Sequence, residues 1–142
     1  MRKVLLIPIL FSFQVMAGTP ILEKHSQSGL MLPEDSFEYN CVINDDGVIA
    51  ITRRNGTGVP LSLMRKMSMK TTNKIKQLIA HAEAGPITEV PPMCDGGNHT
   101  LYGYQDGVRL IITEDLDCGT HQINENSASA PLKRIARKFC GF

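Results

Sequence analysis

The chain has 142 residues, of which 42% are hydrophobic, and it carries 15 lysines and arginines against 14 aspartates and glutamates. A chain of this length accommodates one domain with a modest core and not two. The near balance of charge argues against a general nucleic-acid binder, because such proteins usually carry a strong basic excess.

Residues 1–17 have the pattern of a secretory signal peptide. Arg2 and Lys3 form a basic start, an apolar run extends from residue 4 to residue 13, and cleavage is expected before Gly18. The run is too short to span a bilayer, which takes about 20 apolar residues, and no later run reaches that length. We therefore expect a periplasmic or secreted chain without a membrane span.

Residues 18–35 mix glycine, proline, serine and charged residues without a hydrophobic period. Segments of this composition at a chain end are often poorly ordered. We expect them to form a mobile leader, followed by a single disulfide-stabilised domain over residues 36–142.

The alternation of apolar and polar side chains over residues 37–43 predicts a half-buried strand. A three-residue loop, Asp45-Asp46-Gly47, connects it to a second strand over residues 48–54. This loop length pairs Ile43 with Ile49 and Cys41 with Ile51, so that the apolar side chains of both strands share one face.

The next segment predicts a third strand over residues 61–70, although Arg65 interrupts its apolar side. A helix follows, capped by Thr71 or Thr72 and ending near Ala84. Residues 86–98 contain three prolines and a Gly-Gly pair, so we expect a linker-like loop there.

A second hairpin is predicted over residues 100–113, with a three-residue turn that places Tyr104 opposite Val108. A further short strand over residues 120–123 and a helix from about residue 129 to Gly141 complete the chain. The fold class is therefore α+β: an antiparallel sheet of two hairpins, with extra short strands, packed with two helices. The sequence Asp-Gly-Val occurs in both hairpins, which leaves a hairpin–helix duplication open.

All four cysteines follow the expected cleavage site, and an even number in a small exported domain indicates two disulfides. The predicted turn opposes residues whose numbers add up to 212, as those of Cys94 and Cys118 do. Cys41 on the first strand is then left for Cys140 on the last helix. We predict the pairs Cys94–Cys118 and Cys41–Cys140, since the spacing fits no compact zinc pattern.

Two sets of side chains are candidate metal ligands. His99 and His121 flank the second hairpin and, with Asp95 or Asp117, offer a His/His/carboxylate set. The histidines have no spacing typical of a metalloenzyme helix, and isolated histidines are more often ordinary polar residues.

Three methionines form the second set, since thioethers select copper(I). Their spacing resembles the methionine motifs of periplasmic copper-handling proteins over six residues only. A regular strand or helix does not bring all three to one face, so core and rim packing is the favoured interpretation. The three are Met64, Met67 and Met69.

No catalytic constellation is visible. The sequence lacks a GxSxG elbow and a phosphate-binding loop before a helix, and its paired carboxylates are typical of turns and solvated surface. We predict no catalytic residue and no cofactor.

The leading interpretation is therefore an exported, non-enzymatic binding module for another protein, such as an inhibitor or an envelope accessory protein. The alternative is a metal-binding protein or metal-dependent enzyme built on the ligands above. Whether the sequons at Asn55 and Asn98 carry glycans and whether the chain is oligomeric stay open. The candidate contact residues are Pro91, Pro92, Met93, Asn98, Leu61 and Met64.

Overall fold

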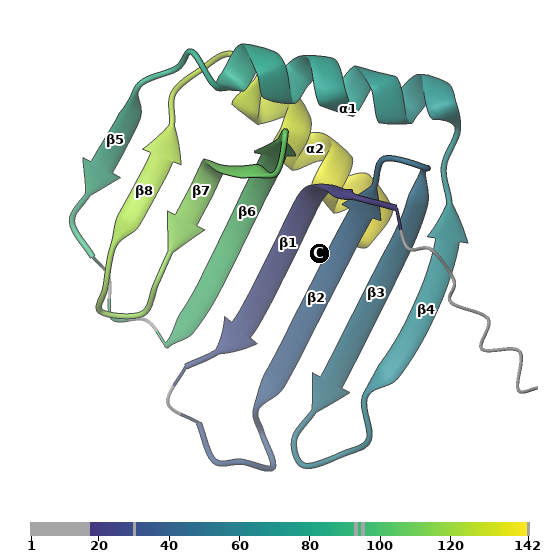
Figure 1. Cartoon of the computed structure of the whole chain (residues 1–142). Coiled ribbons are helices and arrows are strands. Elements are labelled where there is room, and N and C mark those ends of the chain that lie inside the picture. The colour runs from purple at the N-terminus through teal and green to yellow at the C-terminus, as the bar shows by residue number, and fades with distance from the viewer. Residues whose placement is uncertain (1–17, 30, 93, 95, 142) are drawn as a thin grey trace, which may run out of the picture.

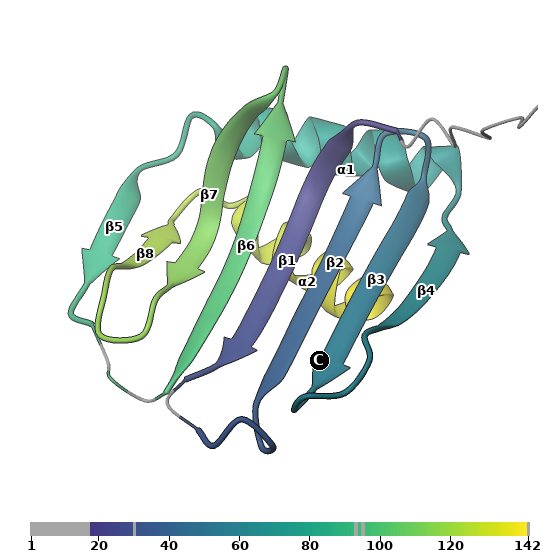
Figure 2. The same cartoon turned by 60° about the horizontal axis from the view of Figure 1, so that its bottom comes forward.

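The computed structural model describes residues 18–29, 31–92, 94 and 96–141. In this part of the chain, eight strands form one antiparallel sheet, and both helices lie on the same face of it (Figure 1). The second view shows the opposite face of the sheet without a covering helix (Figure 2). The strands are β1 (Pro20–Ser28), β2 (Phe37–Asn44), β3 (Val48–Asn55), β4 (Leu61–Lys66), β5 (Ile87–Val90), β6 (Gly97–Gln105), β7 (Val108–Asp115) and β8 (His121–Asn124), and the helices are α1 (Met69–Ala82) and α2 (Ser129–Cys140).

The order of strands across the sheet is β4-β3-β2-β1-β6-β7-β8-β5. Strand β1 therefore lies in the centre, antiparallel to both β2 and β6. The expectation of a mobile leader over residues 18–35 is wrong for this strand, because residues 20–28 join the two halves of the sheet. The proposed signal peptide lies outside the described residues.

The first hairpin has the predicted register. Ile43 pairs with Ile49 and Cys41 with Ile51, and Gly47 adopts a positive φ of 81° in the loop between the strands. All these apolar side chains except that of Ile51 are buried. The register of β2 against β3 is thus the one that places their apolar side chains on one face.

The third strand is shorter than predicted, and the helix begins earlier. Strand β4 ends at Lys66, and Ser68 is the N-cap of α1, where its hydroxyl accepts a hydrogen bond from the Thr71 amide at 3.3 Å. The predicted cap at Thr71 or Thr72 is therefore wrong. Thr72 is fully buried in the first turn of the helix instead.

The expected linker over residues 86–98 also contributes to the sheet. Strand β5 pairs with β8 at the far edge, and β6 already begins at Gly97. The sheet is consequently larger than two hairpins with short additions. Each of the runs β2-β3-β4-α1 and β6-β7-β8-α2 is a meander followed by a helix, but a duplication is not established.

The second hairpin has a different turn from the one predicted. Gln105 pairs with Val108 across the two-residue turn Asp106-Gly107, whose φ angles are 51° and 78°. Positive φ at both central residues is the geometry that suits Asp-Gly in tight hairpins. Further along, an irregularity between Leu101 and Tyr102 shifts the register by one residue.

The core lies between the sheet and the two helices. Helix α1 approaches β6 closely, because a Cβ atom at Gly103 would stand only 3.1 Å from the Ile79 side chain. Burial of each large aliphatic side chain stabilises the fold by roughly 1.5–3 kcal/mol. The fully buried aliphatic side chains are those of Leu22, Ile43, Ile49, Ile75, Ile79, Ile112 and Leu132.

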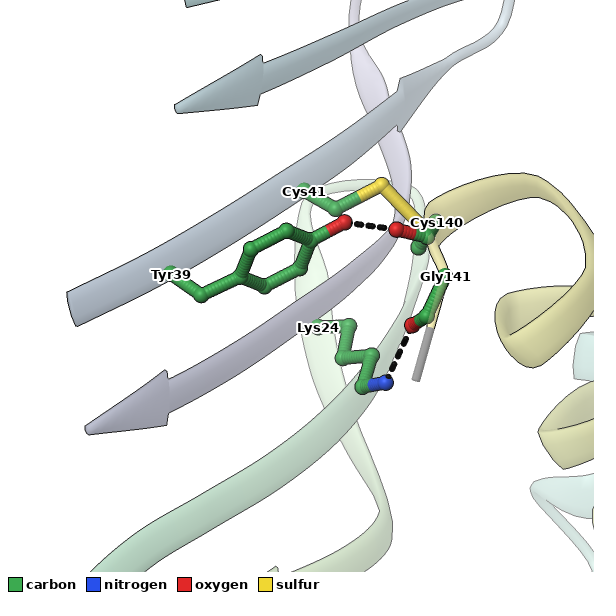
Figure 3. Close-up of a disulfide and its surroundings, with 5 residues drawn as sticks. All are labelled: Lys24, Tyr39, Cys41, Cys140 and Gly141. Atoms are coloured by element: carbon green, nitrogen blue, oxygen red, sulfur yellow. Dashed lines mark hydrogen bonds between the residues drawn. A yellow bond between two sulfur atoms is a disulfide. The ribbon is translucent and has the colours of Figure 1, made fainter. Parts of the chain in front are cut away.

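Two disulfides connect distant segments, and they are the pairs that the sequence predicts. Cys41 on β2 bonds to Cys140 at the end of α2, and Cys94 bonds to Cys118. The first bridge attaches the last helix to the sheet (Figure 3).

Candidate functional site

Strand β4 forms one edge of the sheet and exposes an unusual amount of apolar surface. All six of its residues are exposed, and Leu61 and Met64 retain 74% and 64% of their accessible surface. Leu61 and Leu63 lie on the face that carries the helices, and Met64 lies on the open face opposite Ala50. Both faces of this edge therefore carry exposed apolar side chains.

The same strand ends in two basic residues. Arg65 and Lys66 are exposed, and Lys70 and Lys74 follow on the accessible side of α1. Only β3 pairs with β4 in the sheet, so the outer backbone groups of β4 face away from it. The strand thus combines open hydrogen-bonding positions with apolar and cationic side chains.

The other candidate contact residues lie far from β4. Pro91 and Pro92 are exposed and follow β5, which forms the opposite edge of the sheet. Asn98 is half-buried and has a structural role, since its side-chain oxygen accepts a hydrogen bond from the Asp117 amide at 2.9 Å. Met93 lies outside the described residues. The candidate residues therefore do not form one surface.

The histidines are aligned, but they do not form the metal site considered above. His99 pairs with Asp115, and Asp115 pairs with His121, whose Nδ1 lies 3.9 Å from the Asp115 carboxylate. Asp117, one of the two expected carboxylates, accepts a hydrogen bond from the Gly96 amide instead, and Asp95 lies outside the described residues. No three His, Cys, Asp or Glu residues in the described chain lie close enough together to hold a metal ion.

The methionines are also separated. Met67 is buried in the core, whereas Met64 and Met69 are exposed on β4 and at the start of α1. A copper site through these thioethers would need Met67 to leave the core. Of the three methionines, Met67 therefore has the core-packing role that the sequence favours.

The open face of the sheet carries two tyrosine–carboxylate pairs that the sequence did not indicate. Tyr102 donates a hydrogen bond to Glu114, a buried carboxylate that also accepts from Thr120 at 3.1 Å. Tyr104 donates to Glu23 at 2.6 Å. Burial and the partner carboxylate together raise the pKa of each tyrosine to about 12. Both phenols therefore stay neutral donors at physiological pH.

A cavity of about 590 Å³ lies between the sheet and α2. Its walls come from several strands and from one side of the helix, and four of the described lining residues are lysines or arginines. Sequence reasoning missed it, although one signal was present: Lys24 and Ser26 occupy positions of β1 whose neighbours across the sheet face the helices. These four are Lys24, Arg53, Lys133 and Arg137, and the histidines His25 and His99 are also among the lining residues.

Comparison with protein-family models and with curated proteins finds no match to this chain. In the described residues, no helix is long and apolar enough to cross a membrane. Two disulfides are consistent with an oxidising environment outside the cytoplasm.

Proposed function

We propose that this chain is an exported, non-enzymatic binding module that recognises another protein through edge strand β4. The observation that carries this proposal is the exposure of every residue of β4 at the end of an eight-stranded sheet. An open edge can accept an extended segment of a partner as an additional strand, with backbone hydrogen bonds providing affinity.

Export is supported by two independent features. The pattern of residues 1–17 is that of a secretory signal peptide, and both cysteine pairs are oxidised. We therefore place the mature protein in the periplasm or outside the cell.

The side chains of β4 specify the chemistry of the partner segment. Leu61 and Leu63 on one face and Met64 on the other favour a strand that presents apolar side chains to both faces. Arg65 and Lys66 favour carboxylates at one end of that strand. The same two charges oppose indiscriminate pairing of the edge with other chains, a role that lysine often has on edge strands.

The test uses a charged variant of β4 and a matched variant at the opposite edge. Leu61→Lys/Met64→Lys places charges on both faces of β4, and Ile87→Lys places one on β5, where Ile87 is also exposed. Each protein is used to capture partners from the native envelope or culture medium, and the purified partner is then titrated by calorimetry. We expect the β4 variant to lose binding at least tenfold and the β5 variant to retain it.

Hydrogen exchange of the complex gives a second readout. Strand addition should protect amides of β4 and leave those of β5 unchanged. Equal binding by the β4 variant, or protection confined to another element, would refute the proposal. Adding the protein to a purified hydrolytic partner then separates an inhibitor, which abolishes activity, from an accessory protein, which does not.

A further inference from the structure

The two disulfides differ in their exposure to solvent. Cys41 is fully buried and Cys140 is 6% exposed, whereas Cys94 and Cys118 are both exposed. A disulfide is reduced by a thiolate that must reach one of its sulfur atoms, so access strongly influences the rate. Of the two bonds, Cys94–Cys118 is therefore the one that is open to attack in the folded protein.

The backbone at Cys118 also favours opening of this bond. Cys118 has a φ of 53°, in the left-handed region. A residue with a Cβ atom adopts this conformation at an energetic cost, and it persists there only when the surrounding structure imposes it. The bridge to Cys94 is one such constraint, so breaking it allows the backbone of this loop to relax.

The bridge tethers the segment that leads out of edge strand β5. Cys94 lies between β5, which ends at Val90, and β6. Pro91 and Pro92 connect β5 to Cys94; both are exposed, and proline has no backbone N–H to donate. Cys118 lies in the loop between β7 and β8. The disulfide thus fixes the end of β5 to the loop that precedes its neighbour β8.

Strand β5 has few other attachments in the described sheet. It lies at the outer edge and pairs with β8 over four residues (Figure 1). Its first three residues are exposed and Val90 is half-buried, and none of them belongs to the hydrophobic core. An exposed hydrogen bond joins Gln122 to Glu89 at 3.0 Å, and the beginning of the strand is anchored by a bond of 3.0 Å from the Glu125 amide to the Pro86 carbonyl oxygen. Elements with so few buried apolar contacts open locally at low free energy.

We propose that the Cys94–Cys118 disulfide is a redox-sensitive latch, whose reduction by a dithiol releases β5 from the sheet, beginning at Val90. Strand β8 then becomes the edge and is open to pairing with another strand. The buried Cys41–Cys140 bond stays intact, so α2 remains attached to the sheet. In the oxidising compartment proposed above, the closed latch is the resting state.

The reduction is a thiol–disulfide exchange in two steps. One thiolate of the dithiol attacks a sulfur atom of the bridge, and the other cysteine leaves as a thiolate that takes up a proton. The second sulfur of the dithiol then displaces the first cysteine, which is also released as a thiol. Two electrons and two protons pass from the dithiol to Cys94 and Cys118, and the dithiol becomes a disulfide.

Thiol labelling after partial reduction tests which bond opens. The folded protein is incubated with increasing concentrations of dithiothreitol, quenched with an alkylating reagent and mapped by mass spectrometry. We expect Cys94 and Cys118 to be labelled at a dithiothreitol concentration at least tenfold lower than Cys41 and Cys140, which serve as the internal control. Equal or earlier labelling of the buried pair would overturn the proposal.

Hydrogen exchange tests whether the bridge holds β5. Cys94→Ser/Cys118→Ser lacks the bridge without any reductant, and we expect amides of residues 88–90 to exchange at least tenfold faster in this variant than in the oxidised protein. Amides of β2 and β3 should be unchanged, which shows that the variant folds. If it does not fold, the unmodified protein at the dithiothreitol concentration that opens only Cys94–Cys118 gives the same comparison. Unchanged exchange of β5 would show that the bridge is not a latch.

The latch lies at the opposite end of the sheet from β4. Leu61→Lys/Met64→Lys should therefore show the same order of reduction of the two disulfides as the unmodified protein. Failure of the latch is thus distinguishable from failure of partner binding at β4.

Discussion

The hydroxyl of Tyr39 donates a hydrogen bond to the carbonyl oxygen of Cys140, the residue whose sulfur is bonded to Cys41 two positions further along the same strand (Figure 3). The end of α2 is therefore attached to β2 by a covalent bond and by a buried hydrogen bond. Lys24 on β1 adds a third contact through the carbonyl oxygen of Gly141.

Removing the Cys41–Cys140 disulfide should cost more stability than removing the Cys94–Cys118 disulfide. The sequence separations are 99 and 24 residues, and a longer closed loop restricts the unfolded chain more. Loop-closure entropy gives about 4.7 kcal/mol for the first and about 3.5 kcal/mol for the second. Urea unfolding of the two double cysteine-to-alanine variants measures both values, and the reverse order would contradict the argument.

Tyr39→Phe should lower the free energy of unfolding by about 1–3 kcal/mol, because the carbonyl oxygen of Cys140 loses a donor in a buried place. Tyr104→Phe is the matched control, since its hydroxyl bonds to Glu23 on the open face of the sheet. We expect a smaller loss for that variant in the same urea experiment. An unchanged midpoint for Tyr39→Phe would show that the bond does not stabilise the fold.

Asn124→Ala should be strongly destabilising, by about 2–4 kcal/mol, because it removes four hydrogen bonds from a buried position. The amide nitrogen donates to the carbonyl oxygens of Ala82 and Ile111, and the side-chain oxygen accepts from Asn126 and Ser129. Chemical unfolding measures the loss.

The exposed Asn55 provides the control for this substitution. Its side-chain oxygen accepts a single bond from Arg53 at 3.1 Å, so Asn55→Ala should change stability by less than about 0.5 kcal/mol. Equal effects of the two substitutions would rule out a special role for the buried amide of Asn124.

Tyr102 and Tyr104 should ionise at a higher pH than an exposed tyrosine. Tyr102 and Tyr104 have pKa values raised to about 12, first by burial and then by the carboxylates of Glu114 and Glu23. The ordinary tyrosine pKa is about 10, so the stability from these neutral phenols is complete below pH 10 and is lost as the pH rises through about 12. Absorbance at the tyrosinate band should therefore stay low near pH 10.5.

Substituting one carboxylate at a time tests the cause of these pKa shifts. Glu114→Gln should lower the pKa of Tyr102, and Glu23→Gln should lower that of Tyr104, each toward its ordinary value without reaching it, because burial remains. If neither substitution changes the pKa of its tyrosine, burial alone causes the two pKa shifts.

The sequence predicts the first hairpin well because its inward side chains are apolar, and a change of register would expose Ile49. The sequence does not predict β1, because only some of the side chains on its helix-facing side are apolar. Leu22 is buried, but Lys24 and Ser26 line the cavity, so the strand has no apolar alternation. Polar side chains at inward positions thus remove the alternation by which a strand is recognised.

The second hairpin shows a different limit. The predicted disulfide is present although its register argument is wrong, since the real turn has two residues and an irregularity follows at Leu101. Cys94 and Cys118 lie beyond the paired strands, where a shift of one residue still leaves them within reach. The exposed edge at β4 is not predictable locally, because the order of strands depends on pairings between distant segments.

The central place of β1 has a consequence for how the chain matures. Residues 22–28 of β1 can pair with β2 early, but their other partner, residues 97–103 of β6, follows some seventy residues later in the chain. Pairing across such a distance is slow. A chain whose synthesis or translocation stops before residue 97 therefore presents the inner edge of β1 unpaired, as a place where a chaperone strand, or a β6 strand from a second molecule, can insert.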